Sequence, residues 1–218
     1  MFVGHLAVSL ASKVVEPRAP LASLVAASFG LDLLWPILVL SGVEKVSVDP
    51  GNTAFTPLAF DSYPWSHSLL MACIWGLIAA GITFGVCKVR RAALLVGAVV
   101  VSHWILDFVT HRPDLPLWPG GPGFGLGLWN SIPATLLVEG GFFIAAIFVF
   151  ARTFEARSRS GRWAFWSLVG LTGAIWISQP WSPPPPSSSA VAFAGLAMLL
   201  LPWWAAWIDK HRSSSAAV

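Results

Sequence analysis

Six long apolar segments limit this chain to one class of fold. Each has close to the roughly 20 residues that an α-helix needs to cross about 30 Å of hydrocarbon. Only 11% of the 218 residues are charged, whereas soluble domains have about 25%. The sequence therefore predicts an all-α integral membrane bundle that forms a single domain over residues 1–218. The six segments are residues 20–41, 66–87, 92–110, 133–151, 163–179 and 189–208.

A seventh apolar segment, residues 2–15, is too short to span the membrane. It fits either a half-helix that enters the bundle or a helix that lies in the interface. Its first cation, Lys13, follows the apolar run, whereas a signal peptide begins with a basic region. We therefore expect this segment to be retained, which matters because it carries His5.

Basic residues are concentrated in alternate loops. Most Lys and Arg lie before the first span, between the second and third, between the fourth and fifth, and after the sixth. The positive-inside rule then places both termini in the cytoplasm. Several of the 13 tryptophans lie at predicted span ends, as in interfacial belts. Because the net charge is only +3, we read the basic loops as topology signals and expect no nucleic-acid partner.

A ladder of histidine and aspartate interrupts the third span. His103, Asp107 and His111 follow the spacing H-x-x-x-D-x-x-x-H, and residues four apart lie on one helix face. A charge at the centre of a span costs roughly 2.5–3.5 kcal/mol on insertion scales. Polar groups placed there at such a cost predict a functional site. A divalent metal ion and a proton path are its two obvious uses.

Depth along the predicted helices brings further polar residues to the same level. At 1.5 Å per residue from the outer span ends, Asp32 lies about 13 Å deep and His103 about 11 Å deep. A half-helix over residues 2–15 would place His5 near mid-membrane. We therefore expect one cavity in the outer half of the bilayer. The polar side chains of this cavity would be His5, Asp32, His67, His103, Asp107 and Glu139.

Structural roles are an alternative for several of these residues. His5 could lie at the surface near a frayed N-terminus. Asp32 could cap a helix if the first span breaks after Gly30. Ser66 could cap the second span and leave His67 merely in its first turn.

The same alternative applies nearer the water interface. His111 and Asp114 could be solvated there, and Glu139 could pair with an arginine. The structural alternative is weakest for His103 and Asp107, because the span that contains them offers no cation to the carboxylate.

Metal binding would satisfy these buried groups. Imidazole nitrogens and carboxylate oxygens suit Zn²⁺, Mn²⁺ or Fe²⁺, and zinc is the expected ion. A catalytic zinc takes about three protein ligands and lowers the pKa of its bound water to about 7. Two ions bridged by an aspartate would activate water and hold a phosphoester. We expect Asp107 and Glu139 to act in catalysis. The expected metal ligands are His5, Asp32, His67, His103, Asp107 and His111.

Short motifs in the first 140 residues resemble a known family. The segments GHLAVSLASK, FGLDLLWP, SHSLL and SHWILDFVTH resemble the bacterial LexA-regulated inner-membrane metal-dependent hydrolases, which are similar in ligand order to zinc-dependent phospholipase C. The resemblance implies a helical bundle in the bacterial inner membrane, a metal cluster, and hydrolysis of a phosphodiester or phospholipid. This chain lacks the further ligands that the family has after the position of Asp32, and the H-R-G ahead of the position of His67. The resemblance marks as ligands His5, Asp32, His67, His103 and Asp107.

The rest of the chain contains fewer residues that could act in catalysis or bind a metal ion. Beyond Glu139 the predicted spans contain no acid, base or histidine until Asp209, so residues 1–140 should hold the site. Residues 141–218 should form scaffold helices and a short cytoplasmic tail that is frayed over residues 213–218. The Gly-, Pro- and Trp-rich loop 112–132 cannot be a regular helix. It fits an ordered lid over the site or a plain connector with anchoring tryptophans.

Three functions are compatible with these features. The first is a metal-dependent hydrolase that acts on a lipid or phosphoester from the outer side of the membrane. A proton-coupled transporter would use the same intramembrane His, Asp and Glu residues, although no inverted repeat is visible. A structural or haem-carrying protein is the third, because two histidines can ligate haem iron. We favour the hydrolase.

Overall fold

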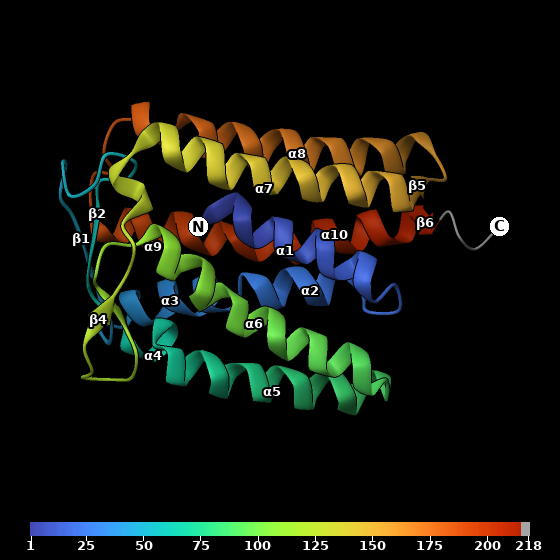
Figure 1. The fold of residues 1–218 in the computed structure, drawn as a ribbon, viewed down its shortest axis with the longest axis horizontal. Coiled ribbons are helices and arrows are strands. Elements are labelled where there is room, and N and C mark those ends of the chain that lie inside the picture. The colour runs from blue at the N-terminus through green and yellow to red at the C-terminus, as the bar shows by residue number, and fades with distance from the viewer. Residues whose placement is uncertain (215–218) are drawn as a thin grey trace.

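A computed structural model describes residues 1–214 as a bundle of roughly parallel helices with loops at both ends (Figure 1). The all-α prediction is confirmed, because β-structure in the described residues is limited to three two-stranded pairs. The helices are α1 (Phe2–Val15), α2 (Leu21–Ser28), α3 (Gly30–Leu40), α4 (Pro64–His67), α5 (Leu69–Cys87), α6 (Arg90–Thr110), α7 (Ile132–Thr153), α8 (Arg159–Ser178), α9 (Ser188–Leu196) and α10 (Leu200–His211), with short 3-10 helices η1 (Leu128–Asn130), η2 (Gln179–Trp181) and η3 (Ala197–Leu199). The strands are β1 (Lys45–Val48), β2 (Leu58–Ser62), β3 (Leu115–Pro116), β4 (Gly123–Phe124), β5 (Phe154–Ala156) and β6 (Arg212–Ser214).

Within the described residues, four helical segments are long and apolar enough to cross a membrane, or five if the bent pair α2–α3 counts as one span. The four are α5, α6, α7 and the run Ser188–His211, which contains α9, η3 and α10. The prediction of six spans is therefore not confirmed in full. Helix α8 covers the predicted span 163–179, but two arginines and many Trp, Ser and Gly residues lower its mean hydropathy.

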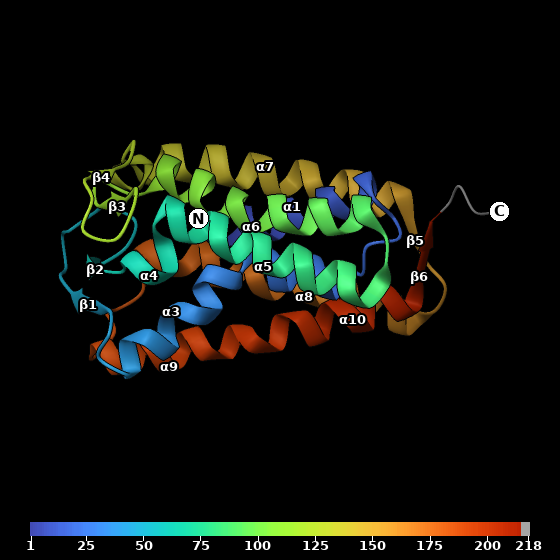
Figure 2. The ribbon, with the colours of Figure 1, turned by 90° about the horizontal axis from the view of Figure 1, so that it is seen from below.

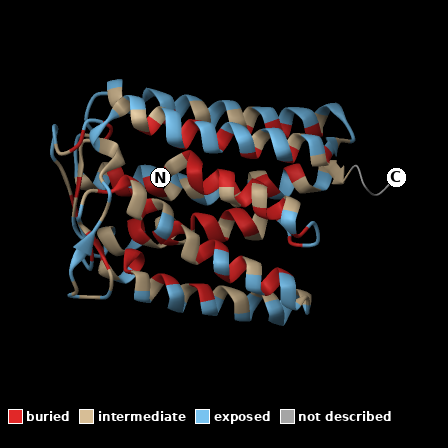
Figure 3. Cartoon of the chain, in the orientation of Figure 1, coloured by how far each residue is buried: buried red, intermediate tan, exposed pale blue. Residues whose placement is uncertain are grey.

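The outward faces of the bundle are apolar. Figure 3 shows exposed residues along the outer sides of α5, α7 and α8, whereas buried residues gather on the sides that face the bundle interior. Leu77 is 75% exposed and Leu137 is 77% exposed. Large apolar side chains along the outer sides of several helices are unusual for a protein in water and are expected where lipid is the solvent.

The first predicted span is two helices with a bend. Helices α2 and α3 meet at 50°, because Phe29 interrupts the helix between them. The bend leaves Asp32 in the first turn of α3, where the backbone N–H groups favour a negative charge. Asp32 therefore lies at the start of a helix, although Phe29 and not Asp32 occupies the capping position.

Helix α1 lies at the centre of the bundle (Figures 1 and 2). Val3, Leu6 and Leu10 are buried in a core cluster with residues of α7, α8 and α10. His5 is only 1% exposed. These facts exclude an interfacial position for α1 and a surface position for His5. The half-helix interpretation matches what is seen, because 14 residues enter the bundle without crossing it.

Helices α5 and α6 form a tight hairpin. A Cβ atom on Gly76 would lie 2.8 Å from the carbonyl oxygen of Gly97, and one on Gly97 would lie 2.9 Å from that of Gly76. The two backbones therefore touch at this crossing, as small residues allow in membrane helix pairs. At the turn, Lys88 ends α5 in the left-handed region with φ 57°. The hairpin fixes α6, the helix that carries His103 and Asp107.

The two ends of the bundle differ in charge. Of the 13 Lys and Arg residues, only Lys45 and Arg112 lie in the loops that contain β1 to β4, which we call the hairpin end (Figure 1). The others lie at the opposite, basic end or in the helix turns next to it. This separation is the one that the positive-inside rule requires of a membrane bundle.

Ion pairs tie the helices together at the basic end. Lys13 Nζ lies 2.9 Å from Asp209 Oδ1, and Asp209 Oδ2 accepts a hydrogen bond from the Leu21 backbone N–H at 2.6 Å. Glu16 accepts hydrogen bonds from the Arg18 guanidinium at 2.9 and 3.1 Å. These bonds lower the pKa of Glu16 from its ordinary 4.5 to about 2.

Part of the C-terminal segment that was predicted to be frayed, residues 213–218, belongs to a strand. Strand β6 pairs antiparallel with β5, with Phe154 opposite Ser214, so the prediction is wrong for residues 213 and 214. The pairing was not visible in the sequence, because a Ser-rich end has no apolar pattern that predicts a strand. The rest of that prediction, residues 215–218, lies outside the described residues.

Candidate metal centre

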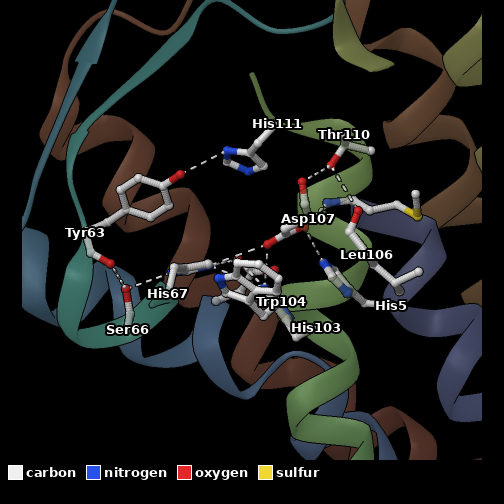
Figure 4. A network of polar contacts seen from close by, with 12 residues as sticks. His5, Tyr63, Ser66, His67, His103, Trp104, Leu106, Asp107, Thr110 and His111 are labelled. Carbon is white, nitrogen blue, oxygen red and sulfur yellow. Dashed lines mark hydrogen bonds and ion pairs between the residues drawn. The ribbon is translucent and has the colours of Figure 1, made fainter. Parts of the chain in front are cut away.

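Five of the predicted site residues lie together in the half of the bundle nearest the hairpin end, and Figure 4 shows four of them, His5, His67, His103 and Asp107. The five come from four helices that are far apart in the sequence. Each has a local reason for its position: the bend presents Asp32, the short helix α4 presents His67, and the i, i+4 spacing of α6 presents His103 and Asp107 on one face. The five residues are His5, Asp32, His67, His103 and Asp107.

Asp107 lies between two histidines. Its Oδ2 atom is 3.0 Å from His103 Nε2, and its Oδ1 atom is 3.2 Å from His5 Nε2. The N-terminal amino group of Met1 also lies 2.5 Å from Oδ1. The carboxylate is 1% exposed, so these groups and not water surround it.

Asp32 lies close to His103 and also to His67. Its Oδ1 atom is 3.4 Å from His67 Nε2 and 3.7 Å from His103 Nε2. The two Nε2 atoms are 3.3 Å apart, and His67 Nε2 is 3.8 Å from Asp107 Oδ2. Five of the six separations among the donor atoms of these four residues are therefore 3.0 to 3.8 Å.

The Nδ1 atoms of His103 and His67 each have a hydrogen-bond partner, and the partner indicates that Nδ1 carries a hydrogen. His103 Nδ1 lies 2.7 Å from the carbonyl oxygen of Ser28, which can only accept, so Nδ1 carries the hydrogen. His67 Nδ1 lies 2.7 Å from Ser66 Oγ. The Ser66 hydroxyl donates to Glu44 Oε2 at 2.6 Å, so it accepts from His67 Nδ1. When both rings are neutral, as a metal ligand requires, their Nε2 atoms present lone pairs to each other.

This donor set fits a metal ion. Two lone pairs at 3.3 Å cannot share a hydrogen bond without an added cation. Donor atoms of a tetrahedral zinc site at bond lengths of 2.0–2.1 Å lie about 3.3 Å from one another, and the separations of 3.0 to 3.8 Å between these histidines and carboxylates are near that value. Two imidazole nitrogens and two carboxylate oxygens are also donors that Zn²⁺, Mn²⁺ and Fe²⁺ accept.

His5 flanks this set without completing it. Its ring stacks on that of His103, with centroids 3.8 Å apart and planes 3° from parallel. Its Nε2 contacts Asp107 through Oδ1, the oxygen on the opposite side from the four-donor set. His5, His103 and Asp107 form a second group that could hold an ion. The two groups share His103, which has only one free nitrogen.

His111 and Glu139 lie outside both groups. His111 Nδ1 is 3.2 Å from the Tyr63 hydroxyl and 3.1 Å from Asp114 Oδ1. His111 is buried, so it is not a solvated interface residue. Glu139 Oε1 accepts a hydrogen bond from the Gly4 backbone N–H at 3.1 Å, which ties α7 to α1.

Asp114 is held as a carboxylate at the hairpin end. Partial burial opposes its ionisation, but hydrogen bonds from His111, Tyr63 and Arg112 outweigh that effect and keep the pKa of Asp114 below its ordinary value. The Tyr63 hydroxyl donates to Asp114 Oδ1 at 2.8 Å. Burial, and then the negative charge of Asp114, raise the pKa of Tyr63 well above 10.

A cavity of about 150 Å³ borders the donor set. Its polar wall contains Asp32, His67, Asp107 and His111, and Glu139 is not among its lining residues. Aromatic rings form much of the remaining wall, and no Lys or Arg lines it among the described residues. The aromatic residues are Phe2, Trp35, Phe55, Phe60 and Trp129.

The loop over residues 112–131 is ordered around this cavity. It contains the β3–β4 pair, and its Gly127 and Leu126 N–H groups donate to backbone carbonyls of His111 and Phe108. Trp129, which the sequence suggested as a membrane-interface residue, instead lines the cavity. This position favours the lid interpretation over that of a plain connector.

Glu44 and Ser66 were not expected to take part in the site. Ser66 was considered only as a helix cap, but Ser68 caps α5 by accepting from the Met71 N–H. Glu44 lies in a long loop without periodic pattern, so nothing in the sequence linked it to His67. The adjacency of Ser66 to His67 was the one available signal.

Comparisons with protein-family models, with curated proteins and with solved structures find no match. The resemblance of the four short motifs to the inner-membrane hydrolases therefore stays a prediction.

Proposed function

We propose that this protein is a membrane-embedded, metal-dependent hydrolase of a phosphoester or phospholipid. The observation that carries the proposal is the pair of Nε2 lone pairs of His67 and His103, which face each other at 3.3 Å between two carboxylates. The amino group of Met1 can balance Asp107 through Oδ1, but the two facing nitrogens and Asp32 remain costly in an apolar bundle unless a further cation joins them. Four-donor spacing close to that of a tetrahedral site supports a divalent ion rather than a shared proton.

The residues that would hold the ion are His67, His103, Asp32 and Asp107, which combine members of both groups, with His5 on the other oxygen of Asp107. Zinc is the expected ion, and manganese or iron would suit the same donors. When bound, such an ion supplies a water nucleophile at neutral pH and polarises an ester. Asp107 lies within 3.8 Å of His5, His67 and His103, so its negative charge is central to holding the donors together.

The cavity that borders the donor set supports an amphiphilic substrate. Asp32 and Asp107 line this cavity, so a substrate bound there would lie next to both carboxylates. Its aromatic wall suits an apolar group next to the reacting ester. Because no Lys or Arg lines it in the described chain, a phosphodiester or a lipid ester fits better than a doubly charged phosphate monoester. The absence of Glu139 from the lining argues for Asp107 rather than Glu139 as the catalytic carboxylate.

The proposal includes a location in the bacterial inner membrane, with α8 as a sixth span and both termini in the cytoplasm. The concentration of Lys and Arg at the basic end supports this orientation. The metal centre would then open to the periplasmic side through the hairpin end. Reporter fusions at residue 157 and at residue 120 should report cytoplasm and periplasm, respectively.

The metal content of purified protein tests the proposed function. Wild-type protein should contain about one equivalent or more of zinc, manganese or iron, and His103→Ala should lose it. His211→Ala makes the same change at the basic end and should retain the metal. Metal-loaded wild type should then hydrolyse a phosphodiester or phospholipid in micelles. If folded wild type takes up no metal from metal-replete medium, the proposal fails, and proton flux in liposomes tests the transporter instead.

A further inference from the structure

Glu44 is a buried acid whose side-chain hydrogen bonds all reach one short segment. It is 1% exposed and precedes β1 at the hairpin end. Its Oε1 atom accepts from the backbone N–H groups of Trp65 and Ser66, both at 2.8 Å. Its Oε2 atom accepts from the Ser66 hydroxyl at 2.6 Å. A charge buried at this cost, aimed at the residue next to His67, requires an explanation beyond capping a four-residue helix.

The charge of Glu44 sets the direction of a hydrogen-bond chain. A carboxylate only accepts, so the Ser66 hydroxyl donates its single hydrogen to it. The alternative acceptor of that hydrogen, the Tyr63 carbonyl, is at 3.4 Å and is uncharged, so it is weaker. Ser66 Oγ is then left to accept from His67 Nδ1 at 2.7 Å. His67 therefore carries its hydrogen on Nδ1 and its lone pair on Nε2.

We propose that Glu44 is a positioning residue of the metal centre, which acts through Ser66 to keep the Nε2 lone pair of His67 directed at the donor set. The inference rests on the proposed metal binding for its functional meaning. Partners of this kind fix the tautomer of ligating histidines, and their loss typically costs about 10–100-fold in metal affinity.

Glu44→Gln gives the sharpest test because it is nearly isosteric. The amide oxygen can still accept from the Trp65 and Ser66 N–H groups, while the amide NH₂ donates to Ser66 Oγ. The Ser66 hydroxyl then donates to His67 Nδ1, and the hydrogen of His67 moves to Nε2. The variant should therefore fold but present an N–H where wild type presents a lone pair. Ser66→Ala breaks the chain, and Ser66→Thr restores a hydroxyl.

Two measurements on the full-length protein in micelles test the inference. Chelator competition should give Zn²⁺ affinities about 10–100-fold weaker in Glu44→Gln and Ser66→Ala, and close to wild type in Ser66→Thr. Nitrogen NMR of ¹⁵N-histidine-labelled, metal-free protein should show His67 protonated at Nδ1 in wild type and at Nε2 in Glu44→Gln. Glu155→Gln, at the basic end, is the matched control.

The outcomes separate the two proposals. Unchanged affinity and an unchanged His67 spectrum in Glu44→Gln overturn the inference, even if wild type binds zinc. If wild type binds no zinc, the proposed function fails, and the tautomer change alone then supports the positioning of His67. If Glu44→Gln does not fold, equal zinc affinities of Ser66→Ala and Ser66→Thr overturn the inference.

Discussion

The imidazole rings of His5 and His103 are stacked 3.8 Å apart and almost parallel, although one lies on α1 and the other on α6. The stack joins the central half-helix to the helix that carries the ladder. The two rings contact different oxygen atoms of the Asp107 carboxylate, because His103 contacts Oδ2 and His5 contacts Oδ1. The two histidines are therefore not equivalent, and their variants should behave differently.

Metal affinity should distinguish these two histidines. His103→Phe removes one of the four clustered donors and should weaken Zn²⁺ binding more than about 100-fold, beyond the usual effect of losing an indirect partner. His5→Phe keeps a flat ring in the stack and should weaken binding by no more than about tenfold. Chelator competition measures both, with His211→Phe as the control. Equal losses at His5 and His103 would contradict the four-donor assignment.

The backbone contact between α5 and α6 should be intolerant of one added methyl group. Gly97→Ala places a Cβ atom 2.9 Å from the Gly76 carbonyl oxygen, so it should lower the free energy of unfolding by about 1–3 kcal/mol. Gly81→Ala in α5 meets no atom within 4 Å and should be neutral or slightly stabilising. Denaturant titration in mixed micelles compares the two. A stable Gly97→Ala protein would show that the helices are not in tight contact.

The ion pair between Lys13 and Asp209 should contribute to stability because the lysine is buried. Its side chain is only 9% exposed, and it also donates to the carbonyls of Pro17 and Ala19 at 3.0 Å. Asp209→Asn leaves the ammonium without its counter-charge and should cost about 3 kcal/mol. Asp61→Asn, on the exposed end of β2, should cost nothing measurable. Denaturant titration that finds equal stabilities for the two variants would refute this role.

Stability at the basic end should fall in acid through Glu16. Its pKa in the folded protein is about 2, against an ordinary 4.5, because Arg18 and then Arg91 favour the charged form. A lowered carboxyl pKa contributes stability that is complete above pH 4.5 and is lost as the pH falls towards 2.

The thermal unfolding of Glu16→Gln shows this directly. The variant should melt below wild type at pH 6, and the difference should shrink between pH 4.5 and pH 2. Other carboxyls titrate in the same range, so the difference between the two proteins and not either curve is the measured quantity. A difference in melting temperature that stays constant with pH would mean that Arg18 does not lower the pKa of Glu16.

Periodicity and depth predicted the parts of the site that lie on regular helices. The i, i+4 spacing required His103 and Asp107 to share a face, and their side chains are 3.0 Å apart. Depth along the spans placed Asp32 at the level of His103, and both contact His67. These predictions depended only on helix geometry, which the sequence determines locally.

The remaining features depend on contacts that no local pattern encodes. Glu44 reaches Ser66 across a loop, so its role follows from tertiary structure alone. A break in the first span was considered only as an alternative, after Gly30, whereas the helix is interrupted at Phe29. Helix α8 covers a segment that was predicted to span the membrane, but tryptophan and arginine lower its hydropathy and it is not among the helices apolar enough to cross a membrane, although it is packed into the bundle.

The central position of α1 has a consequence for how the protein is assembled. Helix α1 is synthesised before α7 and α8, yet its core contacts and the bond from Gly4 to Glu139 depend on them. With 14 residues it cannot cross the bilayer unaided. It must therefore wait at the membrane until its later neighbours have been inserted. The His5 side of the candidate metal centre is accordingly among the last parts of the molecule to form, so a truncated chain that ends before α7 should lack it.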